Sequence, residues 1–228
     1  MISGEAVRND LAYLYETLRA AHFDLYAHRS RDAYDRFFRE VLDSIDGPMT
    51  RLDVVRLFTP FVAFGNIGHA RTDFPVQDYV EYAQAGGTLL PFDIRVEDGR
   101  AFVARNYAEA PALAPGAELL ALNGRAAADW IERTGRYVSA ERPYMTHAQL
   151  ESMFPRLVWL DEGKTDAFRV TVRSGAGGEK TIPVAAVPVM EIEEQKGERE
   201  SLHHSRTAEV LPDGVAYLHP GPFYAADD

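Results

Sequence analysis

The chain has 228 residues and a net charge of −11, with 24 Lys and Arg against 35 Asp and Glu, which argues against a nucleic-acid or anionic-membrane surface because both need clustered positive charge. The absence of cysteine excludes disulfides, thiolate zinc sites and cysteine nucleophiles. No apolar run approaches the roughly 20 residues that a membrane span needs, so we expect no membrane-spanning helix.

Residues 4–64 are predicted to be helical. Over the first twenty residues, apolar side chains recur every three or four positions and make one stripe. Ser30 is a suitable N-cap for a second helix, and Thr50 with Asp53 forms a capping-box variant for a third. Pro60 should kink this third helix or mark a boundary. We therefore expect a helical hairpin and a third helix, packed on another part of the chain.

From Thr88 the apolar period changes to two, which is typical of strands. A hairpin is predicted around Asp98-Gly99, because this pair favours a tight turn. A further strand, a turn at Asn123-Gly124 and another helix follow. This part of the chain is therefore predicted to be rich in strands.

The last third is predicted to contain a helix interrupted at Pro155 and a hairpin with a glycine-rich turn at 175–178. Residues 190–206 are charged and lack a sustained period, so we expect a linker or an exposed loop. A final pair of strands joins at Asp213-Gly214. Because strands need partners at their edges, the last strand either closes a sheet already built or begins a domain beyond Asp228.

Four pieces of the sequence carry a resemblance to a known family. They are a leucine-rich helix leading into His22–Tyr26, the turn GNIGHA at 65–70, the hairpin with its PGAELL strand and NGR turn within 89–131, and GVAYLHPGPF at 214–223. In this order they resemble the tail-specific, or C-terminal processing, serine peptidases, including the tricorn-core type. The sequence departs from the family's usual proline, aspartate and threonine at Phe23, Ile67 and Ala70.

The resemblance implies an α+β fold and a serine endopeptidase of which this chain is the N-terminal part. It further implies a peptide or protein substrate, no cofactor, a location outside the cytoplasm, and a serine nucleophile beyond Asp228. The expected divisions are a helical segment at 1–75, a PDZ-like module at 76–140, a helix with a hairpin and a charged linker at 141–206, and the start of a truncated catalytic domain at 207–228.

His69 is the candidate catalytic residue. In the tricorn-like branch, the resemblance implies that it is the general base, because a serine hydroxyl is a weak nucleophile until a neighbouring group takes its proton. Gly65 and Gly68 would let the backbone turn sharply and allow close approach of another segment. In the branch that uses a lysine base, His69 would not be the base. A histidine just past a helix C-terminus is also favoured by the helix dipole without any catalytic role.

A candidate peptide-binding loop comprises Gly86, Gly87, Thr88, Leu89 and Leu90. Its backbone N–H groups would capture a peptide carboxylate, while the next strand pairs with the peptide. The structural alternative is a flexible turn that enters a strand. The alternative function is a non-catalytic, PDZ-like peptide-binding module, and a third possibility is a stand-alone scaffold.

Two other kinds of site are not expected. His203 and His204 follow Glu191, Glu193 and Glu194, but neighbours on a strand point to opposite faces, and no spacing of the His-Glu-Xaa-Xaa-His kind occurs. We therefore expect a solvated charged loop there and no metal site. No serine stands in a Gly-Xaa-Ser-Xaa-Gly setting, so no nucleophile is predicted within the chain.

Overall fold

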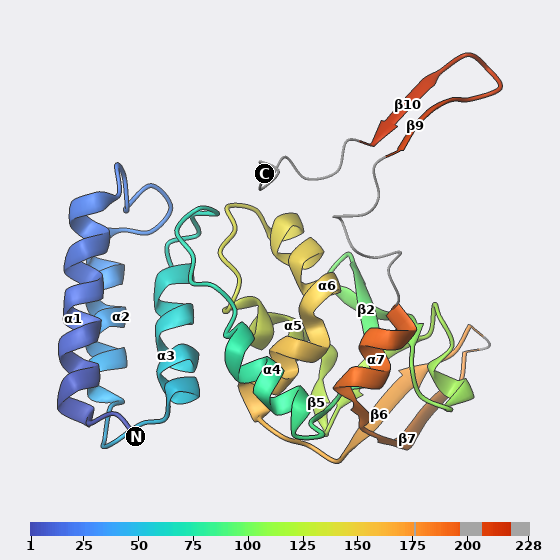
Figure 1. Cartoon of the computed structure of the whole chain (residues 1–228), viewed down its shortest axis with the longest axis horizontal. Coiled ribbons are helices and arrows are strands. Elements are labelled where there is room, and N and C mark those ends of the chain that lie inside the picture. Colours follow the sequence, from blue (N-terminus) through green and yellow to red (C-terminus); the bar gives the residue numbers. More distant parts are fainter. Residues whose placement is uncertain (176, 197–206, 220–228) are drawn as a thin grey trace.

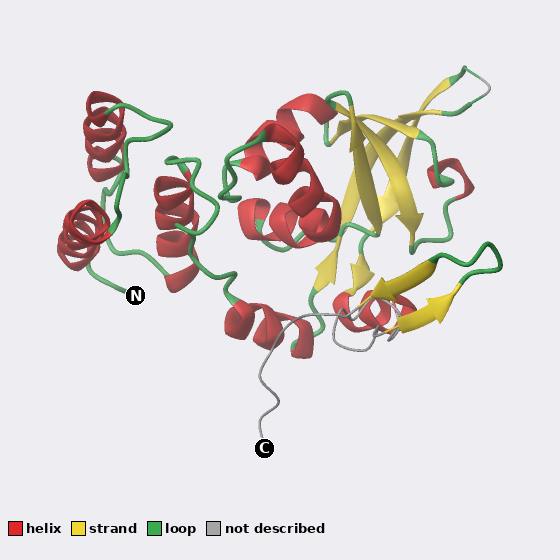
Figure 2. Ribbon diagram, turned by 90° about the horizontal axis from the view of Figure 1, so that it is seen from above, coloured by secondary structure: helices red, strands yellow, loops and turns green. Residues whose placement is uncertain are grey.

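The computed structural model describes residues 1–175, 177–196 and 207–219, and its fold is α+β (Figure 1). Figure 2 shows the first helices set apart from the strands, with further helices between the two. Within the described residues, no helix is long and apolar enough to cross a membrane. The helices are α1 Gly4–Ala21, α2 Arg31–Asp43, α3 Arg51–Ala63, α4 Val76–Gln84, the short 3-10 helix η1 Pro111–Leu113, α5 Ala127–Gly135, α6 Pro143–Glu162 and α7 Val189–Lys196. The strands are β1 Thr88–Leu89, β2 Phe92–Glu97, β3 Arg100–Asn106, β4 Glu118–Leu122, β5 Arg125–Ala126, β6 Ala167–Arg173, β7 Glu179–Ala185, β8 Val187–Pro188, β9 Thr207–Val210 and β10 Ala216–His219.

Helices α2 and α3 begin at the capping residues that the sequence predicts. Ser30 Oγ accepts a backbone N–H from the first turn of α2 at 3.2 Å. At α3, Thr50 Oγ1 accepts the Asp53 N–H at 3.1 Å, and Asp53 Oδ2 accepts the Thr50 N–H at 3.0 Å. The predicted capping box is therefore confirmed. Pro60 lies inside α3, which ends three residues later.

The helical part has its own core, centred on Tyr34 of α2. This ring is fully buried and contacts the rings of Tyr15, Phe61 and Phe64. Its hydroxyl is buried without a hydrogen-bond partner in the described parts of the chain. Burial raises the pKa of Tyr34 to about 12, so the phenol is neutral at physiological pH. A Cβ atom at Gly65 would lie 2.2 Å from this hydroxyl oxygen, so the core leaves no room for a side chain there.

The strands after α4 build an antiparallel sheet in the order β2-β3-β4-β6-β7, with β5 paired to β4. The two predicted tight turns are confirmed. Both residues have positive φ at Asp98-Gly99 (49° and 74°) and at Asn123-Gly124 (52° and 79°), as the tight hairpin turn requires. Asn123 Oδ1 also accepts the Arg169 N–H at 2.9 Å, which ties the turn between β4 and β5 to β6.

This sheet crosses the division that the sequence analysis placed between residues 140 and 141. Strand β6, from the second segment, pairs with β4 from the first. A single hydrophobic core extends from Tyr79 to Ile192. The described residues of this core therefore lie on both sides of the predicted boundary at residue 140.

Three helices differ from the expectation. Helix α6 continues through Pro155 without interruption. Helix α7 occupies the start of the segment expected to be a linker or loop, because Val189 and Ile192, each 1% exposed, anchor it to the core. Helix α4 covers a stretch for which no element was predicted. The remainder of the charged segment, 197–206, lies outside the described residues together with the expected loop at His203 and His204.

Strands β9 and β10 form the predicted final hairpin, in which Gly214 has a φ of 81°. The described side chains from 208 to 218 are exposed, including the apolar Tyr217 and Leu218. The end of the predicted strand, 220–223, lies outside the described residues. This hairpin therefore presents apolar side chains that the other described elements do not cover.

Glu118 connects three strands of the sheet through charged hydrogen bonds. Its carboxylate accepts from Arg100 Nε of β3 and from Arg173 Nη1 of β6, each at 2.7 Å. Arg173 also donates to Glu179 of β7 at 2.7 Å. The hydrogen bond from Arg100, together with the positive charges of both arginines, lowers the pKa of Glu118.

The substitution Glu118→Gln is expected to weaken the pH dependence of the free energy of unfolding in the acid range. A carboxylate whose pKa is lower in the folded chain than in the unfolded chain stabilises the fold at any pH above its unfolded pKa, which is about 4.3 for glutamate. This stabilisation is lost as the pH falls through the pKa of the folded state. Urea unfolding at pH 7, 5 and 3 should therefore show a gap between wild type and variant that narrows with acid. The matched control is Glu109→Gln, at an exposed position. If the difference in unfolding free energy between wild type and Glu118→Gln were the same at pH 7 and pH 3, the lowered pKa of Glu118 would be contradicted.

Candidate functional site

His69 lies in the turn that follows α3, and its side chain is exposed. The backbone reverses at Asn66, which has a φ of 51°, whereas neither Gly65 nor Gly68 has a positive φ. The expectation that the flanking glycines produce the sharp turn is therefore wrong, because asparagine also tolerates this left-handed conformation. Gly65 instead allows the close approach of Tyr34.

Two hydrogen bonds hold the backbone on either side of His69. The N–H of Gly68 donates to Glu141 Oε1 at 3.1 Å. The carbonyl of Ala70 accepts from Ser139 Oγ at 2.7 Å. The segment between α5 and α6 thus forms hydrogen bonds with the residue before and the residue after His69. These bonds attach the turn to the part of the chain that contains the sheet.

The His69 imidazole itself makes no hydrogen bond or ion pair with any residue that the structure describes. Ser139 contacts the turn, but its hydroxyl is committed to a backbone carbonyl and its side chain is buried. Across the described ranges, no serine hydroxyl is paired with His69. The exposed imidazole therefore stands on a turn held by two hydrogen bonds and has no hydrogen-bond partner among the described residues.

The candidate peptide-binding loop, Gly86–Leu90, is engaged within the chain. Its first three N–H groups donate to the carbonyl of Ala83, the carbonyl of Tyr82 and the hydroxyl of Tyr82, at 3.0, 2.8 and 2.9 Å. The side chains of Leu89 and Leu90 are buried in the core, and β1 pairs with β8. A peptide carboxylate could bind these donors only by displacing the internal hydrogen bonds.

Strand β2 stands at one edge of the sheet, where an added peptide strand would pair. Helix α6 lies beside this edge (Figure 1). The Val96 N–H of β2 donates to Glu151 Oε1 of α6 at 2.8 Å. One edge donor of β2 is therefore already satisfied by a side chain, which protects this edge against pairing with another strand.

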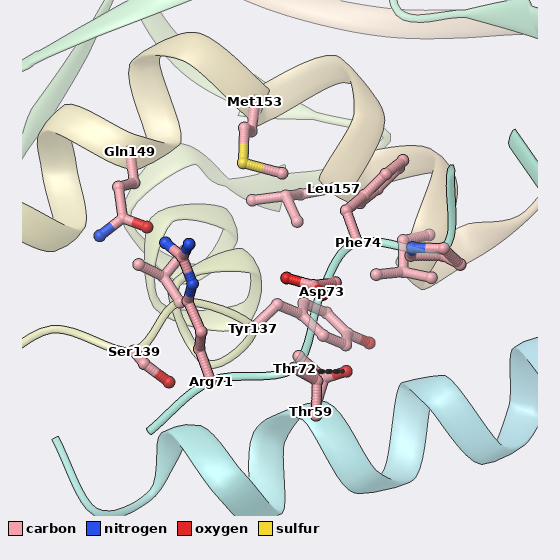
Figure 3. Close-up of a pocket in the computed structure, with 13 residues that line it drawn as sticks. Thr59, Arg71, Thr72, Asp73, Phe74, Tyr137, Ser139, Gln149, Met153 and Leu157 are labelled. Atoms are coloured by element: carbon pink, nitrogen blue, oxygen red, sulfur yellow. Dashed lines mark hydrogen bonds between the residues drawn. The ribbon is translucent and has the colours of Figure 1, made fainter. Parts of the chain in front are cut away.

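A cavity of about 160 Å³ lies between α3, α6 and the segment that follows the His69 turn (Figure 3). Sequence reasoning did not identify it, because its walls come from segments distant in the chain. The one local signal is the position of 71–75 directly after the candidate base. Its lining residues are Thr59, Arg71, Thr72, Asp73, Phe74, Pro75, Tyr137, Val138, Ser139, Gln149, Met153, Leu157 and Leu160.

Two hydroxyl groups in the cavity wall already have partners. Thr72 Oγ1 donates to Thr59 Oγ1 at 2.7 Å, as the dashed line in Figure 3 marks. The Tyr137 hydroxyl donates to Asp161 Oδ1 at 2.8 Å. Burial raises the pKa of Tyr137 to about 12, so this phenol remains neutral at physiological pH. These wall groups therefore leave the interior of the cavity predominantly apolar.

A second, larger groove of about 650 Å³ runs along β2, α6 and α7 and is lined by charged side chains. Its charges are largely balanced within the chain, since Arg156 donates to Glu193 at 2.7 Å and Lys196 lies 3.4 Å from Asp93. Over the described residues, no cluster of histidine and acidic side chains could hold a metal ion. Many of the charged side chains that line this groove are therefore paired within the chain.

No protein-family model and no curated protein matches this sequence. Solved structures of CPAF, a serine protease, do resemble the chain. Mature CPAF is 14% identical over 94% of this chain and 46% of its own, with a TM-score of 0.51. Mature CPAF complexed with lactacystin is 13% identical over 94% and 47%, with a TM-score of 0.52, and a serine-to-alanine mutant is 16% identical over 81% and 34%, also at 0.52. The chain thus shares its fold with part of these structures and spans less than half of their length.

Proposed function

We propose that the chain is the N-terminal part of a serine endopeptidase of the tail-specific or tricorn-like type. It contributes to binding an extended peptide and supplies His69 as general base to a serine beyond Asp228. The observation that carries the proposal is the exposed imidazole on a turn whose two flanking peptide groups are fixed by Glu141 and Ser139. The likeness to serine-protease structures supports the same reading at the level of the fold.

The proposed chemistry needs an imidazole in a defined place. A serine hydroxyl becomes a good nucleophile when a base takes its proton, and the same base must later return that proton to the leaving amine. Positioning matters because a displacement of about 1 Å can cost a hundredfold in rate. The two hydrogen bonds at Gly68 and Ala70 serve this purpose, since they limit the movement of the backbone that carries His69.

The proposal is tested by the mass of the protein as its own cells make it and by its reaction with a fluorophosphonate probe. We expect a mass clearly above 25.5 kDa and covalent labelling at one serine that lies after Asp228. Heat-denatured protein serves as the control for nonspecific labelling. A native protein of 25.5 kDa that does not react with the probe would overturn the proposal.

A second candidate is a non-catalytic peptide-binding module. The described residues pair no serine with His69, which agrees with such a module as well as with a serine after Asp228. The same two measurements separate the candidates, because only the peptidase carries a serine that reacts with the probe.

A further inference from the structure

The cavity beside α3 and α6 has an apolar interior of defined size. Leu157 and Leu160 of α6 are each 2% exposed, and Val138, Phe74 and Met153 complete the apolar surface. Its volume, about 160 Å³, is close to that of apolar protein cavities of about 150 Å³ that hold benzene. A leucine or phenylalanine side chain therefore matches the cavity in both size and polarity.

Polar side chains accompany this apolar interior. Arg71, Asp73 and Gln149 line the cavity, and in the described parts of the chain their side chains form no hydrogen bond or ion pair. Figure 3 shows the ends of Arg71 and Gln149 pointing toward each other at one side. Arg71 and Asp73 are opposite in charge and exposed, so they favour a neutral ligand with both donors and acceptors. The backbone of a peptide has this character.

The cavity also lies close to the candidate base along the chain. Arg71 follows His69 by two residues, so their Cα atoms are at most about 7 Å apart. Successive residues of an extended peptide advance by about 3.3 Å. A peptide whose reacting bond faces His69 would therefore place a side chain at this cavity from a residue within about two or three positions of that bond.

We infer that this cavity is a substrate subsite, which receives a leucine- or phenylalanine-sized apolar side chain of a peptide near the bond to be cleaved. The inference rests on the proposed function for the identity of the bound chain. Arg71, Asp73 and Gln149 pair with the peptide's N–H and C=O groups, while Leu157 and Met153 contact the inserted side chain. The subsite thus selects an apolar residue within about two or three positions of the scissile bond.

Methyl NMR of the 228-residue chain tests the binding without catalysis. The chain has five methionines, so protein labelled with ¹³C at the methionine methyls gives few signals, and Met153→Leu assigns the one in the cavity. The probes are N-acetyl-leucinamide and, as the polar counterpart, N-acetyl-asparaginamide. We expect saturable movement of the Met153 signal with the first probe and none with the second. An unmoved Met153 signal would overturn the subsite.

Two variants on α6 locate the ligand, because Met153 also borders the charged groove. Gln149 lines only the cavity, and Ser152 lines only the groove. The substitution Gln149→Trp therefore narrows the cavity, and Ser152→Trp narrows the groove. We expect the Met153 response to disappear in Gln149→Trp and to persist in Ser152→Trp. The reverse pattern would place the ligand in the groove and overturn the inference. The dispersion of the other methionine signals reports whether each variant is folded.

Kinetics of the full-length protein test the role in specificity. Gln149→Trp should lower kcat/KM by about tenfold or more for a peptide with leucine at one of the two or three positions nearest the cleaved bond. It should affect the asparagine analogue of that peptide much less. Equal losses for both peptides would overturn the specificity role. If N-acetyl-leucinamide binds but His69→Ala leaves turnover unchanged, the subsite stands and the assignment of His69 as general base is overturned. The two proposals can therefore fail separately.

Discussion

Replacing His69 by alanine in the full-length protein is expected to lower kcat for peptide hydrolysis by at least about a thousandfold, with a much smaller change in KM. Removal of one member of a serine–base pair disables the pair, while binding and the stabilisation of the oxyanion are retained. The side chain is exposed and makes no hydrogen bond or ion pair with the described residues. Its loss should therefore leave the melting temperature nearly unchanged.

His28→Ala is the matched control, because this histidine is also exposed but lies in the loop between α1 and α2. Initial rates over a range of peptide concentrations separate kcat from KM, and a thermal scan of each variant monitors folding. Turnover that is equal in His69→Ala and His28→Ala would exclude His69 as the general base. The assignment of the base would then pass to a residue after Asp228.

Gly65→Ala is expected to destabilise the chain by about 3 kcal/mol, at the upper end of what overpacking a core costs. The new Cβ would lie 2.2 Å from the Tyr34 hydroxyl oxygen, and Tyr34 cannot move freely because rings of the helical core surround it. Denaturation with urea measures the loss. The control is Gly47→Ala, where a Cβ would meet no atom within 4 Å.

A second substitution should relieve this clash. Tyr34→Phe removes a hydroxyl that is buried without a partner in the described residues, so on its own it should cost little or even stabilise. In the double variant, the nearest atoms to the new Cβ, in Ile67 and in ring 34, would lie at 3.4 Å, an ordinary contact. We expect a favourable coupling of at least about 1 kcal/mol in the double-mutant cycle. If the effects of the two substitutions on stability were additive, the Tyr34 hydroxyl would not be the source of the destabilisation caused by Gly65→Ala.

The elements that the sequence predicts well are those whose signals are local. Ser30 and the Thr50–Asp53 pair mark helix starts because capping involves residues three apart. Asp98-Gly99 and Asn123-Gly124 mark turns because few residues tolerate a positive φ.

What the sequence does not reveal depends on contacts between distant segments. The helical state of α7 rests on the burial of Val189 and Ile192 against a core built from other segments. The pairing of β4 with β6, which lie on either side of the predicted boundary at residue 140, leaves no mark on the periodicity of either strand. At the candidate site, His69 itself was identified from its motif. Its fixation by Ser139 and Glu141, and the cavity beyond Arg71, could not be found without the fold.

The separation of the two cores has a consequence for the order in which the chain matures on the ribosome. Every fully buried member of the helical core lies at or before Ile67, so this part can fold early in synthesis. The sheet must wait, because the edge of β4 stays unpaired until β6 has been made. Unpaired strand edges are where nascent chains associate wrongly. We therefore expect the nascent chain to be most prone to wrong association between the synthesis of α5 and the completion of β6.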